Sequence, residues 1–156
     1  MRNLNFYTLR ALSFFFSIVF LYTTSIEANM PTLKTIDGQT ISLPSLKGKW
    51  IFINYWASWC TPCLHEIPTF NQFYQQYKNK NIAVFGVNYD GLPVNEQRPL
   101  IKQYQLDYPS LAIDPAEILN LGEIKGIPVT FIFNPNGTLL DTKYGEQSLK
   151  SLSAYL

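Results

Sequence analysis

The chain has 156 residues, of which 47% are hydrophobic and 15% are charged, and its formal net charge is +1. This length suits one domain, and the composition favours a packed core over disorder. Twelve Lys and Arg residues against eleven Asp and Glu residues, with no basic tract, argue against a nucleic-acid partner.

The first 28 residues have the pattern of a targeting segment. Arg2 and Arg10 precede the apolar run from Ala11 to Tyr22. A positively charged start before such a run is typical of a secretory signal peptide. The run is short for a membrane span, which needs about 20 apolar residues. Two interpretations stand, a cleaved signal peptide and a retained N-terminal membrane anchor. Under both, we expect a periplasmic or other extracytoplasmic protein whose domain spans residues 31–156.

The first half of this domain carries three clear patterns. Apolar and polar residues alternate around Asp37-Gly38, which predicts a β-hairpin over 31–46. The apolar run from Trp50 to Ala57 predicts a central strand buried on both faces. From Thr61 to Lys78 apolar residues recur every three or four positions, as in an amphipathic helix. Pro68 inside this helix should kink it.

The second half continues the alternation of strands and helices. The patterns predict a buried strand at 82–89, a polar loop at 90–99, a helix at 100–105, a short strand at 108–113, a helix over 114–123 that opens with Asp-Pro, a hairpin at 128–145 and a last helix at 147–155. The predicted fold is α/β, with a central mixed sheet flanked by helices.

Cys60 and Cys63 are the only cysteines of the chain, spaced Cys-x-x-Cys. A bridge that closes so small a loop constrains little of the unfolded chain, so a purely structural disulfide is disfavoured. A zinc site needs three or four ligands, and the only histidine available is His65. We therefore expect no metal at this motif.

A redox role fits the local structure that the sequence predicts. Cys60 falls where a buried strand turns into a helix, and the free N–H groups and dipole of a helix N-terminus stabilise a thiolate. We expect Cys60 to attack a substrate disulfide. Cys63, one turn further and more buried, would resolve the mixed disulfide. Trp59 should be exposed beside the sulfurs, and Trp56 should point into the core.

The segment "WASWCTPCLHEIP" resembles the active site of the TlpA/ResA/CcmG-like thiol:disulfide oxidoreductases. The resemblance runs from about residue 31 to the C-terminus, and "GIPVTF" (Gly126 to Phe131) looks like the cis-proline loop of that family. It implies a thioredoxin-like fold with an N-terminal β-hairpin and a central βα insertion. It also implies functional positions: catalytic Cys60, Cys63, Glu66 and Pro128, and substrate-binding Trp59, Thr61, Pro62 and Ile127. No cofactor beyond the Cys60–Cys63 disulfide is expected.

The resemblance also bears on two polar residues near the motif. Asn54 lies where thioredoxin itself carries a buried aspartate, and TlpA-like proteins resemble this chain in having asparagine there. Glu66 matches an acidic residue that lies beside the cysteine pair in ResA-like members. The resemblance implies that Glu66 is a base of raised pKa that manages the proton of Cys63. The alternative is an ordinary carboxylate in the first turn of a helix.

The residues between the cysteines bear on the direction of electron flow. Pro62 has no N–H, so one donor that would stabilise the Cys60 thiolate is missing, and no histidine between the cysteines adds positive charge. Both features predict a disulfide that is hard to reduce. We therefore expect a protein disulfide reductase, with a potential nearer to about −270 mV, as in thioredoxin, than to about −120 mV, as in DsbA. Separately, we expect the protein to be a monomer.

The resemblance also implies partners: a membrane thiol electron donor of the DsbD/CcdA type and protein disulfide substrates, such as those of cytochrome c maturation. Val129 stands after Pro128 where the cytochrome-maturation branch usually carries glutamate, which weakens that assignment. The alternatives are a protein disulfide oxidase or isomerase and a thiol peroxidase. A peroxiredoxin needs Thr or Ser three residues before its reactive cysteine, and Ala57 holds that place.

Overall fold

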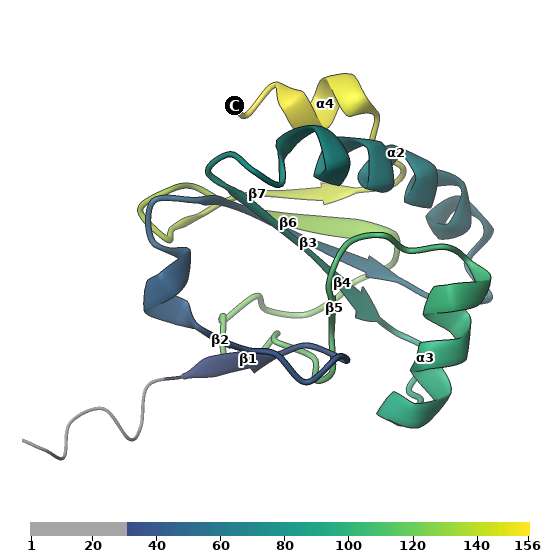
Figure 1. The fold of residues 1–156 in the computed structure, drawn as a ribbon. Coiled ribbons are helices and arrows are strands. Elements are labelled where there is room, and N and C mark those ends of the chain that lie inside the picture. Colours follow the sequence, from purple (N-terminus) through teal and green to yellow (C-terminus); the bar gives the residue numbers. More distant parts are fainter. Residues whose placement is uncertain (1–30) are drawn as a thin grey trace, which may run out of the picture. The chain divides into compact units, whose positions relative to one another are not determined.

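A five-stranded sheet with the order β5-β4-β3-β6-β7 forms the centre of the fold (Figure 1). The computed structural model describes residues 31–156. Its central strand β3 (Trp50–Trp56) pairs in parallel with β4 (Ile82–Asn88) and antiparallel with β6 (Val129–Phe133). The edge strands are β5 (Ser110–Leu111) and β7 (Leu139–Tyr144). The mixed α/β sheet and both hairpins predicted from the sequence are confirmed.

The N-terminal hairpin is a separate two-stranded sheet of β1 (Thr32–Lys34) and β2 (Thr40–Ser42). Its turn places Gly38 at φ 89°, in the left-handed region that glycine adopts without a steric penalty. The 3-10 helix η2 (Leu43–Leu46) follows β2. A single bridge between Thr35 and Leu111 joins the hairpin to the edge of the central sheet.

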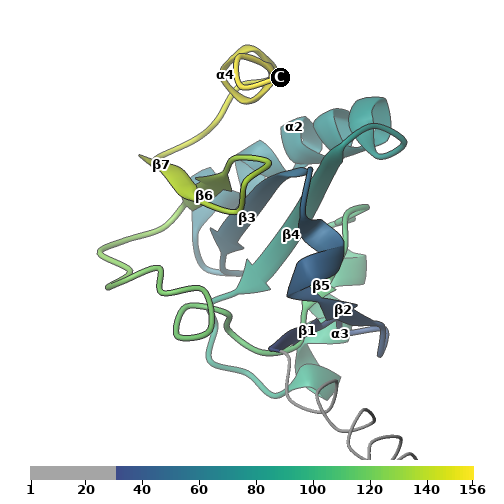
Figure 2. The same ribbon diagram turned by 90° about the vertical axis from the view of Figure 1, so that its left-hand side faces the viewer.

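Helices α2 (Thr61–Tyr77) and α4 (Leu149–Ser153) lie side by side over one face of the central sheet, and the hairpin lies on the other side (Figures 1 and 2). Because side chains alternate along a strand, β3 supplies two hydrophobic cores. Phe52 and Trp56 pack in the core under α2, whereas Ile51, Ile53 and Tyr55 face the opposite core. This explains the continuous apolar run that predicted β3.

The long predicted helix is confirmed as α2. Its sequence carries one internal proline, Pro68, and the helix continues through it to Tyr77. The predicted kink stays a prediction. The last helix is confirmed but shorter than expected, because Ser148 caps its start in a capping box with Ser151.

Two predictions between β4 and β6 are wrong. Helix α3 (Val94–Gln103) begins well before the expected position, and it contains Pro99, which was expected to end the polar loop. The expected helix over 114–123 is instead a pair of turns, in which Leu119 N–H donates to the Pro115 carbonyl. The left-handed Asn120, at φ 51°, ends this turn before a helix can propagate.

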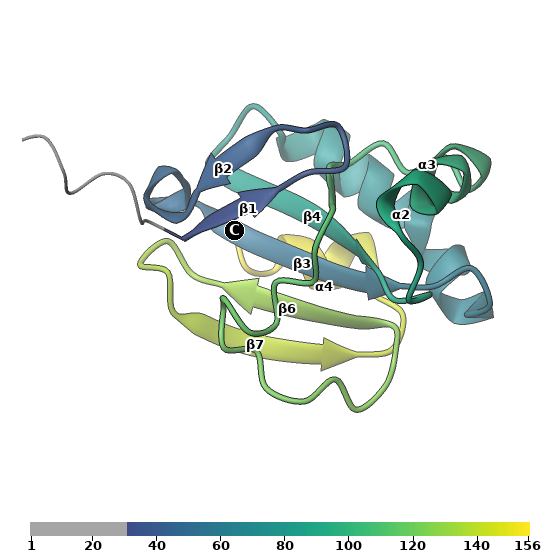
Figure 3. The same cartoon turned by 90° about the horizontal axis from the view of Figure 1, so that it is seen from below.

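No helix among residues 31–156 is long and apolar enough to cross a membrane. The predicted targeting segment at 1–28 lies outside the described residues. Figure 3 shows the face of the sheet away from α2, where the hairpin and the irregular segment between β5 and β6 pass over the strands.

Candidate active site

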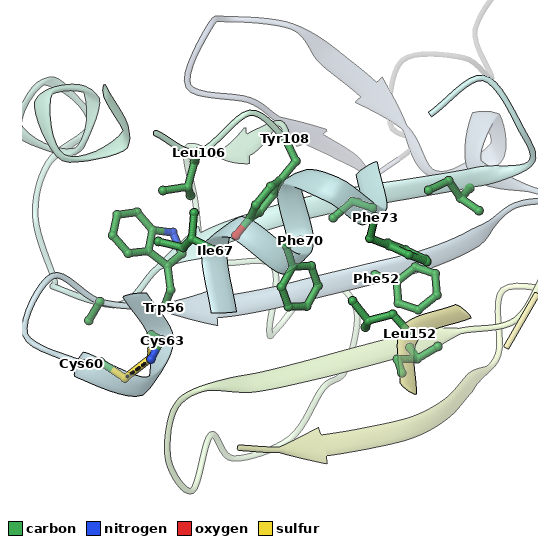
Figure 4. Packing of buried hydrophobic residues seen from close by; sticks show 14 residues of the cluster. Phe52, Trp56, Cys60, Cys63, Ile67, Phe70, Phe73, Leu106, Tyr108 and Leu152 are labelled. Carbon is green, nitrogen blue, oxygen red and sulfur yellow. Dashed lines mark hydrogen bonds between the residues drawn. A yellow bond between two sulfur atoms is a disulfide. The ribbon is translucent and has the colours of Figure 1, made fainter. Parts of the chain in front are cut away.

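The two cysteines form a disulfide at the start of α2, directly after the central strand. The chain turns where the Cys60 N–H donates to the Ala57 carbonyl at 3.2 Å, and Cys60 then caps α2. The S–S distance is 2.04 Å, and the Cys63 N–H donates to the Cys60 Sγ at 3.3 Å (Figure 4). Cys60 is 5% exposed and Cys63 is fully buried. The expected helix-terminal place of Cys60 and deeper place of Cys63 are confirmed.

The residues around the disulfide divide into an exposed group and a buried one. Trp59 is 66% exposed, and Thr61 and Pro62 are exposed in the first turn of α2. Trp56 is fully buried in the same core as both cysteines (Figure 4), and its ring meets Tyr104 edge to face. Both tryptophans therefore lie as predicted.

The peptide bond between Ile127 and Pro128 is cis, as the family resemblance predicted. Pro128 directly precedes β6, whose first residue, Val129, pairs with Tyr55 near the end of β3. Ile127 packs against the core that contains the cysteines. The sheet thus brings the Ile127–Pro128 segment next to the strand that leads into Cys60.

Glu66 is a buried carboxylate on α2, one turn after Cys63, and only 2% exposed. Its Oε1 accepts a hydrogen bond from Asn54 Nδ2 at 2.6 Å, and its Oε2 accepts one from the Gln147 N–H at 2.9 Å. These bonds connect α2 to the middle of β3 and to the segment before α4. In this disulfide form, both carboxylate oxygens are therefore engaged by protein donors.

Burial raises the pKa of Glu66 to about 7, although the donors from Gln147 and Asn54 lower it, and Glu146 nearby adds to the rise. Desolvation therefore outweighs the two hydrogen bonds. The direction of this shift agrees with the raised pKa that the resemblance implied, and the catalytic role of Glu66 stays a prediction. A carboxyl group that titrates near neutral pH can hold or release a proton under physiological conditions.

The polar network around Glu66 extends further than the sequence indicated. Asn54 is fully buried and accepts a hydrogen bond from the Tyr108 hydroxyl at 3.1 Å, and its amide also lies 3.4 Å from Thr130 Oγ1. Burial and the charge of Glu66 raise the pKa of Tyr108 well above its usual range, so this hydroxyl stays a donor. Sequence reasoning missed Tyr108 and Gln147. A lone asparagine inside an apolar strand signals that buried partners exist, but not which ones.

A second group that the sequence analysis missed holds the loop before Cys60. The Asp90 carboxylate accepts hydrogen bonds from the Ser58 N–H at 3.0 and 3.1 Å and from the Ser58 hydroxyl at 2.7 Å. Asn88 Nδ2 donates to the same carboxylate at 2.6 Å. The end of β4 thereby fixes the position of the segment that carries the disulfide.

His65 lies at the surface and takes no part in these networks; its Nδ1 is 3.6 Å from Glu146 Oε1, and its side chain is 66% exposed. Among residues 31–156, no group of three or more His, Cys, Asp or Glu side chains is arranged to hold a metal ion. The chemistry that these residues support is thiol–disulfide exchange.

Comparison with known proteins agrees with this geometry. The model of the AhpC/TSA family matches residues 26–142. The chain belongs to this family. Within it, the chain is 33% identical to the thiol-disulfide oxidoreductase ResA of Bacillus cereus (strain ZK / E33L) over 131 residues, which are 83% of this chain and 75% of that protein. It is 31% identical to sporulation thiol-disulfide oxidoreductase A of Bacillus subtilis (strain 168), over 79% of this chain and 75% of that protein.

Solved structures of this AhpC/TSA member's relatives share the fold. The crystal structure of StoA from Bacillus subtilis superposes with a TM-score of 0.67 at 29% identity, covering 80% of this chain and 94% of that one. A thioredoxin-family thiol:disulfide interchange protein from Chlorobium tepidum TLS gives 0.68 at 26% identity, covering 81% and 91%. The chain is a thioredoxin-fold thiol-disulfide oxidoreductase of the ResA/StoA type, with Cys60 and Cys63 as its Cys-x-x-Cys pair.

Proposed function

We propose that this oxidoreductase is an extracytoplasmic reductase of protein disulfides. The observation that carries the direction is the first turn of α2, where Cys60 is the cap and Pro62 contributes no N–H. The Cys63 N–H is the one backbone donor within this disulfide loop that points at the Cys60 sulfur. A poorly stabilised thiolate corresponds to a disulfide of low reduction potential, which donates electrons once reduced.

The proposed cycle uses the two cysteines in turn. A membrane dithiol donor of the DsbD/CcdA type transfers two electrons and two protons to the Cys60–Cys63 disulfide, and the donor becomes a disulfide. The Cys60 thiolate then attacks a substrate disulfide, which forms a mixed disulfide and releases one substrate thiolate. Cys63 attacks the Cys60 sulfur, re-forms the internal disulfide and releases the substrate as a dithiol.

Other residues assist these steps. Glu66, one turn after Cys63, takes the proton of the Cys63 thiol as Cys63 becomes the attacking thiolate. Trp59, Thr61 and Pro62 form the exposed surface at the sulfurs. The substrate backbone lies between this surface and the Ile127–Pro128 segment. No cofactor other than the disulfide takes part, and the protein acts as a monomer. The disulfides of cytochrome c maturation are proposed substrates on the family resemblance alone, and Val129 after Pro128 argues against them.

Trapping of partners tests this proposal. Cys63→Ala should hold Cys60 in mixed disulfides, and mass spectrometry of the adducts then identifies both the donor and the substrate. Cys60→Ala is the matched control and should trap nothing. Fractionation of the cells that make the protein locates the adducts. If Cys63→Ala forms no adduct that depends on Cys60, the proposed cycle is wrong.

The direction has its own measurement. The equilibrium of the Cys60–Cys63 disulfide with a glutathione buffer should give a potential nearer to about −270 mV than to about −120 mV. The reduced protein should reduce insulin disulfides and should not turn over peroxide. A potential near the DsbA value would favour the oxidase or isomerase alternative instead.

A further inference from the structure

A hollow of about 390 Å³ lies at the carboxyl ends of the parallel strands. Its floor and walls come from the end of β4, from the loop that follows, from α3 and from the segment after β5; Figure 1 shows β4 running toward α3. The lining residues are Asn88, Tyr89, Gly91, Leu92, Gln97, Ala112 and Asp114. Nothing in the reaction described above uses this hollow.

The hollow is connected directly to the loop that carries the disulfide. Asn88 pairs with Trp56 in the sheet register, and the Tyr89 N–H donates to the Trp56 carbonyl at 2.8 Å. Asp90 holds Ser58, and Ser58 is only two residues, or at most about 7 Å of chain, from Cys60. These contacts place the end of β4, which lines the hollow, beside the loop that carries Cys60, so a side chain a few residues from a cysteine joined to Cys60 is the candidate occupant.

Gln97 supplies a buried acceptor without a partner. Its residue is 7% exposed, and its Nε2 donates to the Leu92 carbonyl at 2.7 Å. Its Oε1 is buried and has no hydrogen-bond partner among the described residues. A buried carbonyl left unpaired is costly, and such groups are uncommon in folded proteins. A ligand that donates a hydrogen bond in the hollow would remove this cost.

Asp114 and Tyr89 define the chemistry of that ligand. Asp114 Oδ1 accepts hydrogen bonds from the Tyr55 hydroxyl at 2.5 Å and from the Ala116 N–H at 2.9 Å, which fixes the carboxylate and leaves its Oδ2 for a ligand. Tyr89 is 40% exposed and offers an aromatic surface. None of the described lining residues is Lys or Arg. Carboxylate, carbonyl and aromatic ring together match a guanidinium or ammonium group.

We propose that this hollow is a substrate subsite that binds an arginine or lysine side chain located a few residues from the cysteine under attack. The proposal rests on the function proposed above, because only a disulfide-bearing polypeptide would bring such a side chain to this place. Arginine fits best, since its planar group has several N–H donors for the oxygens of Asp114 and Gln97 and a face that can stack on Tyr89.

The test uses prereduced full-length protein in single-turnover reactions with synthetic disulfide peptides. The peptides are identical except for Arg, Ala or Glu at positions two to four residues from the cysteine. We expect the half-saturating concentration to be roughly fivefold lower for the best Arg peptide than for the Ala peptide, and higher for the Glu peptide, as for an exposed charge pair with an aromatic neighbour.

Variants assign the preference to the hollow. Asp114→Asn keeps an oxygen for Tyr55 and Ala116 but removes the charge, and should reduce the Arg-over-Ala ratio toward one. Asp114→Arg should reverse the order of the Arg and Glu peptides. The control, Asp107→Asn, removes an exposed carboxylate outside this hollow and should leave the ratio unchanged.

The outcomes separate two failures. If prereduced protein reduces all peptides with the same half-saturating concentration, or if Asp114→Asn keeps the full Arg preference, the subsite is wrong and the reductase function stands. If none of the peptides is reduced at all, the proposed function itself is wrong. Circular dichroism of each variant confirms that a lost preference does not come from a lost fold.

Discussion

Glu66 combines properties that conflict in most proteins, since it is a carboxylate with 2% exposure that is tied to both β3 and the segment before α4. Its two donors, Asn54 Nδ2 and the Gln147 N–H, would normally keep a carboxylate ionised, yet burial outweighs them and raises its pKa to about 7. The protonated form is therefore favoured more in the folded protein than in the unfolded chain.

This difference gives a pH dependence of stability with a definite sign. Because the folded pKa, about 7, lies above the value of 4.5 for an unperturbed glutamate, the contribution of Glu66 is most favourable at low pH and is lost as the pH rises through 7. Between pH 5 and pH 8 this loss amounts to about 2 kcal/mol of unfolding free energy. Urea unfolding at both pH values measures it, and Glu66→Gln should abolish it.

Glu117→Gln serves as the control, because Glu117 is exposed. It should leave the pH dependence unchanged. The same Glu66→Gln variant should lose the step near pH 7 in the rate at which Cys63 resolves a mixed disulfide. If Glu66→Gln retains both the stability change and the kinetic step, Glu66 does not titrate in this range and the role proposed for it is wrong.

The sequence could predict which residues matter at the disulfide but not how they are connected. Cys60, Cys63, Glu66 and Pro128 all stand in short local motifs, and local motifs are visible in one sequence. The bonds of Asn54 to Glu66 and Tyr108 join residues that are 12 and 54 positions apart. Such pairs depend on strand order and register, which cannot be read from local patterns in one sequence.

The first turn of α2 contains the elements that set the electron affinity of the disulfide. Cys60 is the cap, Pro62 follows within the first turn, and the Cys63 N–H points back at the Cys60 sulfur. The dipole of this helix favours a Cys60 thiolate, while the missing N–H of Pro62 limits that effect. Substitution of Pro62 should therefore change the stability of the Cys60 thiolate directly.

Pro62→His should raise the reduction potential of the disulfide by on the order of 30 mV, because a protonated imidazole beside the thiolate adds about 1.4 kcal/mol of stabilisation to the reduced form. Pro62→Ala restores the N–H without the charge and should give a smaller rise. Equilibration with glutathione measures both potentials.

The matched control is Pro68→His, which places the same side chain at an exposed position further along the same helix. It should leave the potential near the wild-type value. A potential for Pro62→His equal to or below that of the wild type would show that this position does not limit the stability of the thiolate.

Elements in which apolar residues recur regularly could be predicted from the sequence, and elements in which they recur irregularly could not. Strand β3 and helix α2 each present an uninterrupted pattern and were predicted almost to their ends. The segment 114–123 has a favourable helix start at Asp114-Pro115, but Asn120 adopts φ 51°, which a helix does not allow. Nothing in the sequence signals this left-handed conformation. In α3, Pro99 suggested a loop, yet Glu96 favours the first turn and Gln97 anchors it to Leu92.

The two cores on either side of β3 hold the molecule together, and α4 contributes to only one of them. Leu152 of α4 is fully buried in the core that contains Phe52, Phe73 and the cysteines (Figure 4). The helix itself has only five residues, too few to be stable alone in water. Its position therefore depends on packing against this core, to which Leu149 and the adjacent Tyr155 also contribute, and on the bond from Gln147 to Glu66.

Leu152→Ala should lower the unfolding free energy by about 2–5 kcal/mol, the usual range for a buried leucine that leaves a cavity. Urea unfolding monitored by tryptophan fluorescence gives the value. Leu140→Ala, at a 53% exposed position of β7, should cost far less. Equal losses for the two variants would mean that α4 does not pack as described.

Both edges of the central sheet have features that disfavour pairing with further strands. At one edge, β5 has only two residues and meets the N-terminal hairpin through Thr35 and Leu111. At the other, β7 presents the ion pair of Lys143 and Asp141, with 2.9 Å between Nζ and Oδ2. Charged residues and short strands discourage the edge-to-edge pairing that leads to aggregates. With pairing along its sides disfavoured, the part of the sheet that remains for contact with another chain is the carboxyl end of β3, where Cys60 and Cys63 lie.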